Sequence, residues 1–91
     1  MSHVITSSDE LIARVRKIAG QVASVERALA DGDPCATVLH RVAAVRGAVN
    51  GLVDEIIAAH LDTHVAAPDL SDAARAQGAK ELLTVIRRYL K

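Results

Sequence analysis

Three side chains of this sequence have the chemistry of metal ligands, and their spacing is unusual. Cys35 comes where a helix is expected to begin, directly after Pro34. His60 and His64 lie four residues apart near the expected end of that helix, so both imidazoles can point at one ion. However, unbroken helix would separate Cys35 from His60 by about 38 Å, whereas a metal ion holds its ligands at about 2.0–2.3 Å. A site that joins these residues must therefore take Cys35 from a second subunit.

Each of these residues also has a simpler interpretation. Two histidines near a helix C-terminus can complement the helix dipole. A lone cysteine is often a small buried hydrophobe, although Cys35 at a helix start is placed where the thiolate form is favoured. Both interpretations stay open on these residues alone.

The elements that must position these residues are helices, because every strong apolar pattern has a helical period and none alternates as a strand does. We expect helices at about 8–30, 34–64 and 71–90, after an arm of residues 1–7. Ser7 and Glu10 form a capping box at the first start, and Gly32 suits the first helix end. The first two helices carry apolar seams in steps of three and four residues. The members are Leu11, Val15, Ile18, Val22, Val25 and Leu29, then Val38, Val42, Val45, Val49, Leu52 and Ile56.

Composition indicates one small all-α domain, residues 1–91, that completes its core by oligomerising. The chain is 51% hydrophobic but has no Phe, no Trp and a single Tyr, and short chains with small cores commonly need such support. Gly47 and Gly51 in the second helix predict close approach of a neighbouring helix, which offsets their low helix propensity. A single cysteine suits a reducing cytosol. Neither a signal peptide nor a membrane span is present, so we expect a cytoplasmic protein.

Folding the first helix back along the second brings the arm with His3 beside His60 and His64. Two such hairpins, paired with their second helices antiparallel, place Cys35 of one protomer beside the histidines of the other. Two-fold symmetry then gives two equivalent sites per dimer. Three imidazoles and one thiolate suit nickel, cobalt or zinc, and they suit copper(I) less well.

A second candidate site is a basic strip on the first helix. Arg14, Lys17 and Gln21 share one helical face opposite the apolar seam, as residues that contact DNA phosphates would. The formal net charge is zero, which argues against non-specific coating of DNA but not against specific binding.

Several segments together resemble the CsoR/RcnR/FrmR family of small bacterial repressors, which sense copper, nickel and cobalt, or formaldehyde. They are Arg14–Gln21, Cys35, Ala43–Leu52, His60, His64 and Tyr89–Lys91. The resemblance covers nearly the whole chain and weakens between about 65 and 80. It implies a three-helix protomer, an antiparallel helical-hairpin dimer that forms a four-helix bundle, and a tetramer built as a dimer of dimers. It also implies that the apo-tetramer binds operator DNA and releases it when effector binds.

Carried over by position, Arg14 and Lys17 are the first DNA contacts to consider, followed by Arg16 and Lys91. Copper sensors usually have cysteine at the position of His64, and formaldehyde sensors have a residue other than histidine there. We therefore expect a nickel- or cobalt-responsive repressor that controls metal efflux. The alternative is a formaldehyde-responsive repressor with Cys35 as nucleophile. An enzyme is not expected, since no carboxylate is placed as a general base.

Overall fold

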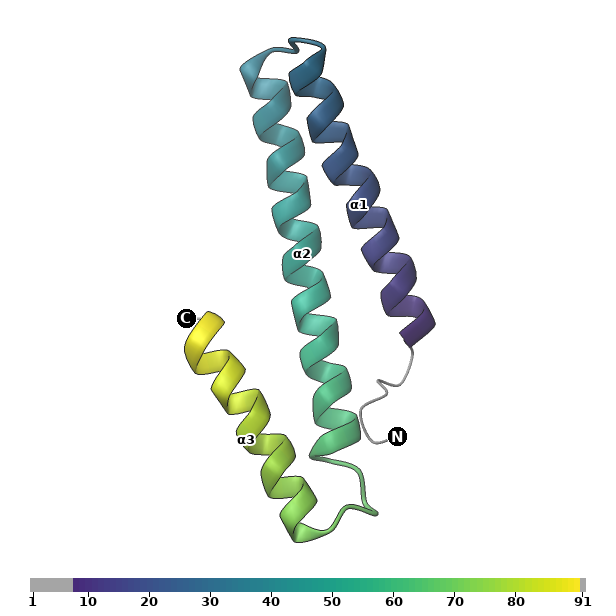
Figure 1. Ribbon diagram of the computed structural model, residues 1–91, viewed down its shortest axis with the longest axis vertical. Helices are drawn as coiled ribbons and strands as arrows, with labels where there is room; N and C mark the ends of the chain where they lie inside the picture. The colour runs from purple at the N-terminus through teal and green to yellow at the C-terminus, as the bar shows by residue number, and fades with distance from the viewer. Residues whose placement is uncertain (1–7, 91) are drawn as a thin grey trace. The chain divides into compact units, whose positions relative to one another are not determined.

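Three α-helices make up the described part of the chain, residues 8–90 of the computed structural model (Figure 1). They are α1 (Ser8–Ala30), α2 (Cys35–His64) and α3 (Asp72–Tyr89). The expected bounds agree with these to within one residue, and no strand occurs in residues 8–90, so the all-α prediction is confirmed. None of these helices is both long and apolar enough to cross a membrane. His3, Ser7 and Lys91 lie outside the described residues.

The turn that follows α1 is built by a glycine in the left-handed region. Gly32 has φ 67°, and its amide donates to the carbonyl oxygen of Leu29 at 3.2 Å. The amide of Asp33 donates to the carbonyl oxygen of Ala28 at 2.9 Å. These two bonds form a Schellman motif, in which glycine avoids the steric penalty of a positive φ. The chain therefore reverses sharply and enters α2 three residues after Gly32.

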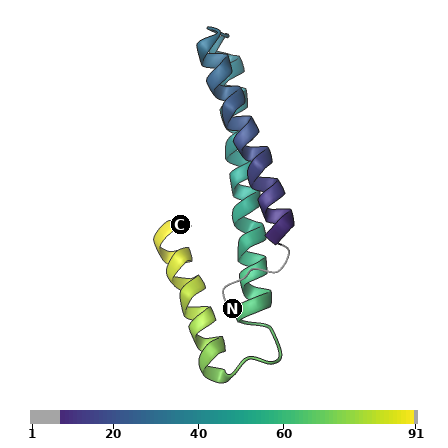
Figure 2. The ribbon, with the colours of Figure 1, turned by 45° about the vertical axis from the view of Figure 1, so that its right-hand side comes forward.

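Residues 9–54 form one compact unit, in which α1 lies antiparallel beside the first part of α2 (Figures 1 and 2). Arg41 ties the two helices together. Its Nη1 donates to the carbonyl oxygen of Ser24 at 3.1 Å and to Ser24 Oγ at 2.9 Å. Ile18 and Ala28 are buried.

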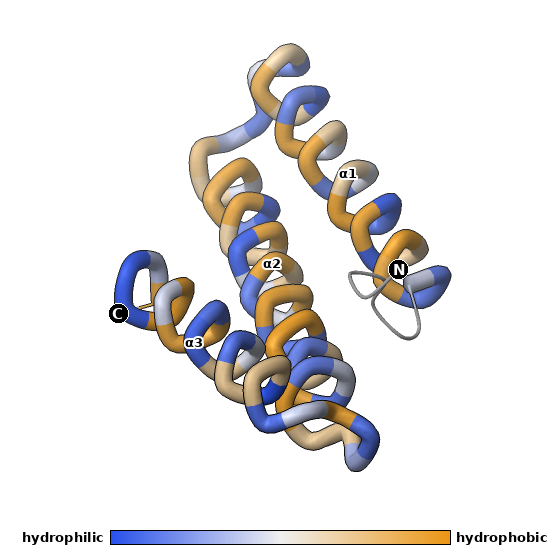
Figure 3. The backbone as a smooth tube through the Cα atoms, turned by 60° about the horizontal axis from the view of Figure 1, so that its bottom comes forward, coloured by the Kyte–Doolittle hydropathy of each residue, from blue (hydrophilic) through white to orange (hydrophobic). Residues whose placement is uncertain are grey.

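The apolar seams divide into two sets, and only one set packs inside this hairpin. The inner set is at least half-buried and comprises Leu11, Ile18, Val25, Val38, Val45 and Leu52. The other set, which we call the outer seam, is between 39% and 63% exposed and comprises Val15, Val22, Leu29, Val42, Val49 and Ile56. Within each helix its members recur every seven residues, the spacing of a coiled-coil contact. Figure 3 shows the resulting apolar stripes along α1 and α2. One chain therefore leaves a long apolar surface uncovered.

A second compact unit contains the described residues from Glu55 onward, which comprise the last part of α2 and all of α3. Ser71 caps α3, since its Oγ accepts from the amide of Ala74 at 3.1 Å. Gly78 is buried against the last residue of α2. A Cβ at Gly78 would lie 2.8 Å from the carbonyl carbon of His64 and 2.9 Å from its Cβ, and it would overlap the carbonyl oxygen. The absence of a side chain at Gly78 therefore allows α3 to pack on α2.

Gly78→Ala is expected to destabilise the protein although alanine is the better helix former. The clash is with backbone, which cannot rotate away, so the loss is about 1–3 kcal/mol. Gly20→Ala is the matched control, because nothing lies within 4 Å of a Cβ at Gly20, and it is expected to stabilise by up to about 1 kcal/mol. Urea unfolding of both variants measures the difference. Equal stabilisation by the two substitutions would show that Gly78 is not tightly packed.

Candidate metal centre and nucleic-acid surface

The two predicted histidine ligands lie side by side at the end of α2. The ring centroids of His60 and His64 are 4.9 Å apart, and their planes are inclined by 46°. Both residues are half-buried. Spacing of four residues thus brings the two rings to one face of the helix, close enough to bind the same ion.

The orientation of the His60 ring is set by α3. Its Nε2 lies 2.7 Å from the carbonyl oxygen of Gly78. A carbonyl oxygen only accepts hydrogen bonds, so Nε2 must carry the proton in this arrangement. In the neutral ring, Nδ1 then keeps its lone pair and is the nitrogen that can bind a metal. Metal-binding histidines commonly have this kind of backbone support on the other nitrogen.

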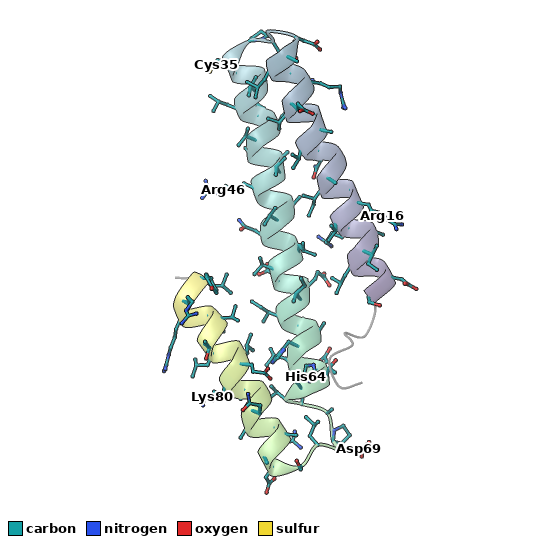
Figure 4. The ribbon with its side chains drawn as sticks, in the orientation of Figure 1. Arg16, Cys35, Arg46, His64, Asp69 and Lys80 are labelled. Atoms are coloured by element: carbon teal, nitrogen blue, oxygen red, sulfur yellow. The ribbon has the colours of Figure 1, made fainter. Side chains whose placement is uncertain are left out.

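Cys35 lies at the opposite end of α2 from His64, beside the hairpin turn (Figure 4). Its side chain is exposed, so in the single chain it is not a buried hydrophobe. The helix between the two ends is unbroken, and helix geometry keeps Cys35 about 38 Å from His60 along it. No group of three or more His, Cys, Asp or Glu residues that could hold a metal occurs among residues 8–90. One chain therefore brings together two of the four predicted ligands, and His3 lies outside the described part.

Three of the predicted DNA contacts gather around one cleft in the hairpin unit. A cleft of about 420 Å³ is lined by Arg14, Lys17 and Gln21, together with Ala13 and Ala48. Arg14 and Lys17 are exposed, and the Gln21 side chain is half-buried. The guanidinium, ammonium and amide groups are donors suited to phosphate oxygens.

Of the remaining two predicted contacts, only Arg16 belongs to the described residues. Arg16 is exposed on α1 but does not line the cleft, and its label in Figure 4 marks its position on that helix. Lys91 lies outside the described residues. The structure therefore groups Arg14, Lys17 and Gln21 and leaves Arg16 apart from them.

The glycines of α2 differ in what they approach. A Cβ at Gly51 would lie 2.9 Å from Nη1 of Arg14, so the guanidinium crosses from α1 onto the bare backbone of α2. Nothing lies within 4 Å of a Cβ at Gly47. Within the single chain, close approach is therefore found at Gly51 but not at Gly47, where close packing of another helix stays a prediction for the oligomer. One glycine accommodates a side chain, and the other faces open space.

Two residues near the histidines were missed by the sequence reasoning. Gly78 had a usable signal, because an isolated glycine within a helical pattern commonly has a packing reason. Arg75 had none. Its guanidinium hydrogen-bonds the backbone between α2 and α3, and an arginine near a helix start is usually solvated.

Comparisons with known proteins agree with the resemblance expected from the sequence. Residues 7–88 match the model of the family described as metal-sensitive transcriptional repressor. Over the full length of both chains, the protein is 46% identical to an uncharacterised protein in the bioA 5′ region of Serratia marcescens. It is 41% identical, again over both full lengths, to the transcriptional repressor RcnR of Salmonella typhimurium.

A solved structure has the same fold. It is a variant of the formaldehyde-responsive regulator FrmR from Salmonella enterica serovar Typhimurium, with histidine in place of a glutamate. The TM-score is 0.86 at 39% identity, and the match covers 96% of this chain and 98% of that one. The protein therefore belongs to the metal-sensitive transcriptional repressors of the CsoR/RcnR/FrmR family, which are DNA-binding regulators and not enzymes.

Proposed function

We propose that this repressor senses nickel or cobalt with His3, Cys35, His60 and His64, and that the bound metal releases it from operator DNA. The observation that carries the proposal is the adjacent pair of imidazoles at one end of α2, with an exposed thiol at the other end. The full-length similarity to RcnR repressors supports the nickel and cobalt type within the family. Zinc fits the same donors, and selectivity then depends on geometry and supply.

The site is completed by a second copy of the chain. The outer seam is long, apolar and exposed on both helices of the hairpin, so a partner hairpin can cover it as a four-helix bundle. If the two α2 helices pair antiparallel, Cys35 of the partner subunit lies beside His60 and His64. Two such dimers make the proposed homotetramer, and each dimer carries two equivalent sites.

Binding of an ion at this site links parts that are otherwise separate. Nickel or cobalt would supply short, directed bonds to imidazole and thiolate donors. In this arrangement, His60 and His64 hold the end of one α2 at the ion. Cys35 holds the start of the neighbouring α2 there, and His3 brings the N-terminal arm to the same ion. A tetramer shape stabilised in this way fits operator DNA less well, with a coupling free energy of about 1–3 kcal/mol. We propose that the protein acts in the cytoplasm of a bacterium and that the process it regulates is metal efflux.

Mixing two defective variants tests the shared site. One chain carries Cys35→Ala and the other carries His60→Ala with His64→Ala, so neither forms a complete site alone. In a mixed dimer, the intact cysteine of one chain meets the intact histidines of the other. An equal mixture is then expected to recover about a quarter of the wild-type sites, because half of the dimers are mixed and each has one good site. Cobalt-thiolate absorption after co-refolding measures the recovery.

Two outcomes of the mixing experiment would contradict the proposal. Absence of recovery in a mixture shown to contain mixed dimers would place the donors within one chain. Wild-type cobalt absorption and DNA release by Cys35→Ala alone would remove the cysteine from the site.

We also propose that the cleft of Arg14, Lys17 and Gln21 contacts phosphates of the operator, and that Arg16 and Lys91 make further contacts with the DNA. Four copies of this cleft in a tetramer would together form a surface that binds DNA, and added salt would weaken this binding strongly. The guanidinium of Arg14 takes its place in this surface because Gly51 has no side chain beneath it.

Gly51→Ala is expected to weaken operator binding without destabilising the protein. The new methyl displaces the flexible end of Arg14, and losing one charge-assisted contact of about 1.5 kcal/mol reduces affinity about tenfold. Gly47→Ala is the matched control, with the same change one helical turn away and open space around it. Operator titrations, urea unfolding and sedimentation compare the two variants. If Gly51→Ala and Gly47→Ala both keep the wild-type oligomeric state and bind the operator equally well, the result would count against the role of Gly51.

Formaldehyde is the second candidate effector, favoured by the fold similarity to FrmR and by the exposure of Cys35. The thiolate would add to the aldehyde carbon, and an amine would then displace the hydroxyl as water, leaving a methylene bridge. Mass spectrometry after exposure to formaldehyde is expected to show a gain of one carbon atom per bridge if this reading is right. Release of operator by formaldehyde in the presence of a metal chelator would favour it over metal sensing.

A further inference from the structure

Arg75 binds the backbone of the segment that connects α2 to α3. Its Nη1 donates to the carbonyl oxygens of Val65 and Ala67, the latter at 3.2 Å, and its Nη2 donates to the carbonyl oxygen of Leu70 at 3.4 Å. The side chain is half-buried. One guanidinium thus holds three backbone acceptors spread over six residues, a use of its planar fork that a lysine cannot reproduce.

The first of these acceptors belongs to the end of α2. The amides of Val65 and Ala66 both donate to the carbonyl oxygen of Leu61, at 3.1 and 2.7 Å, which closes the last helical turn. Carbonyl groups beyond that point have no partner within the helix. Arg75 supplies the donor for Val65, the residue directly after His64. An arginine of α3 therefore caps the helix end that carries the histidine pair.

The same side of α3 also orients the histidine pair. Arg75 and Gly78 are three residues apart and so share a face of α3. The Gly78 carbonyl accepts from Nε2 of His60, and the Gly78 backbone packs against His64. A change in how Arg75 holds the connecting segment would therefore shift the carbonyl that fixes the His60 ring.

We propose that Arg75 is a positioning residue for the histidine pair and not a contact to DNA. This inference rests on the proposed metal function, because its purpose is to present both imidazoles to one ion. Through the contacts with Val65, Ala67 and Leu70, Arg75 keeps α3 against the end of α2. The ring of His60 then keeps the tautomer in which Nδ1 is available to the metal.

Arg75→Gln tests this proposal, and Arg88→Gln is the matched control. Both substitutions remove one positive charge from α3, but Arg88 is exposed and its guanidinium lies over the Tyr89 ring at 6.0 Å. Arg75→Gln is expected to lower the affinity for Co(II) about 10- to 100-fold, the usual effect of losing support for a metal ligand. It is also expected to change the Co(II) absorption spectrum. Arg88→Gln is expected to match the wild type in both measurements.

Two measurements on the metal-free protein separate this proposal from the proposed function. Hydrogen exchange of the amides in residues 61–71 is expected to accelerate in Arg75→Gln only. Ring ¹⁵N shifts of His60 are expected to change from the Nε2-protonated form to a mixture of tautomers. If wild type and Arg88→Gln both fail to bind Co(II) while these two changes occur, the metal function fails and the positioning role stands.

Wild-type exchange, ring shifts and Co(II) affinity in Arg75→Gln would overturn the proposal. Arg75→Lys covers the case in which the glutamine variant does not fold. It keeps the charge, but one ammonium cannot hold three separate carbonyls, so the same changes are expected at smaller size. Full wild-type behaviour of Arg75→Lys in exchange and ring shifts would likewise overturn the role of the guanidinium fork.

Discussion

The unbroken length of α2 is the constraint on which the rest of this structure depends. A helix rises about 1.5 Å per residue and cannot bring its own ends together. In this chain the exposed thiol of Cys35 stands at one end, and the paired rings of His60 and His64 stand at the other. The metal site and the apolar surface are therefore both incomplete in a single chain. The outer seam has no cover within the described chain, and the histidine pair has no third ligand there. A second hairpin would complete both.

Local rules placed the elements of this fold accurately, because the information lies within a few residues of each boundary. Gly32 ends α1 through its positive φ, and Ser71 caps α3. The spacing of His60 and His64 was enough to place their rings together. Helical periodicity also grouped Arg14, Lys17 and Gln21 correctly on one face of α1. It placed that face opposite the apolar seam, however, whereas the three residues line a cleft beside Ala48 of α2.

Contacts that depend on backbone from another helix could not be predicted from the sequence. The carbonyl of Gly78 accepts from His60, and the guanidinium of Arg75 reaches three carbonyls of the connecting segment. A backbone carbonyl has no sequence identity, so no residue pattern marks it as a partner. The contrast between Gly47 and Gly51 was unpredictable for a different reason, because it depends on the direction that the long Arg14 side chain takes.

The choice between metal and formaldehyde as effector turns on what surrounds the thiol and not on the thiol itself. A thiolate that donates its electron pair to a metal has less nucleophilicity to offer an aldehyde carbon, so the two chemistries compete for Cys35. In the proposed dimer, the nearest donors to Cys35 are His60 and His64 of the partner subunit. Two adjacent imidazoles, one of them oriented from behind by a backbone carbonyl, favour chelation. A formaldehyde bridge instead requires a free amine, which a histidine ring does not provide. In the proposed site, the residue at position 64 therefore decides whether the thiol and His60 meet a further imidazole, and here that residue is histidine.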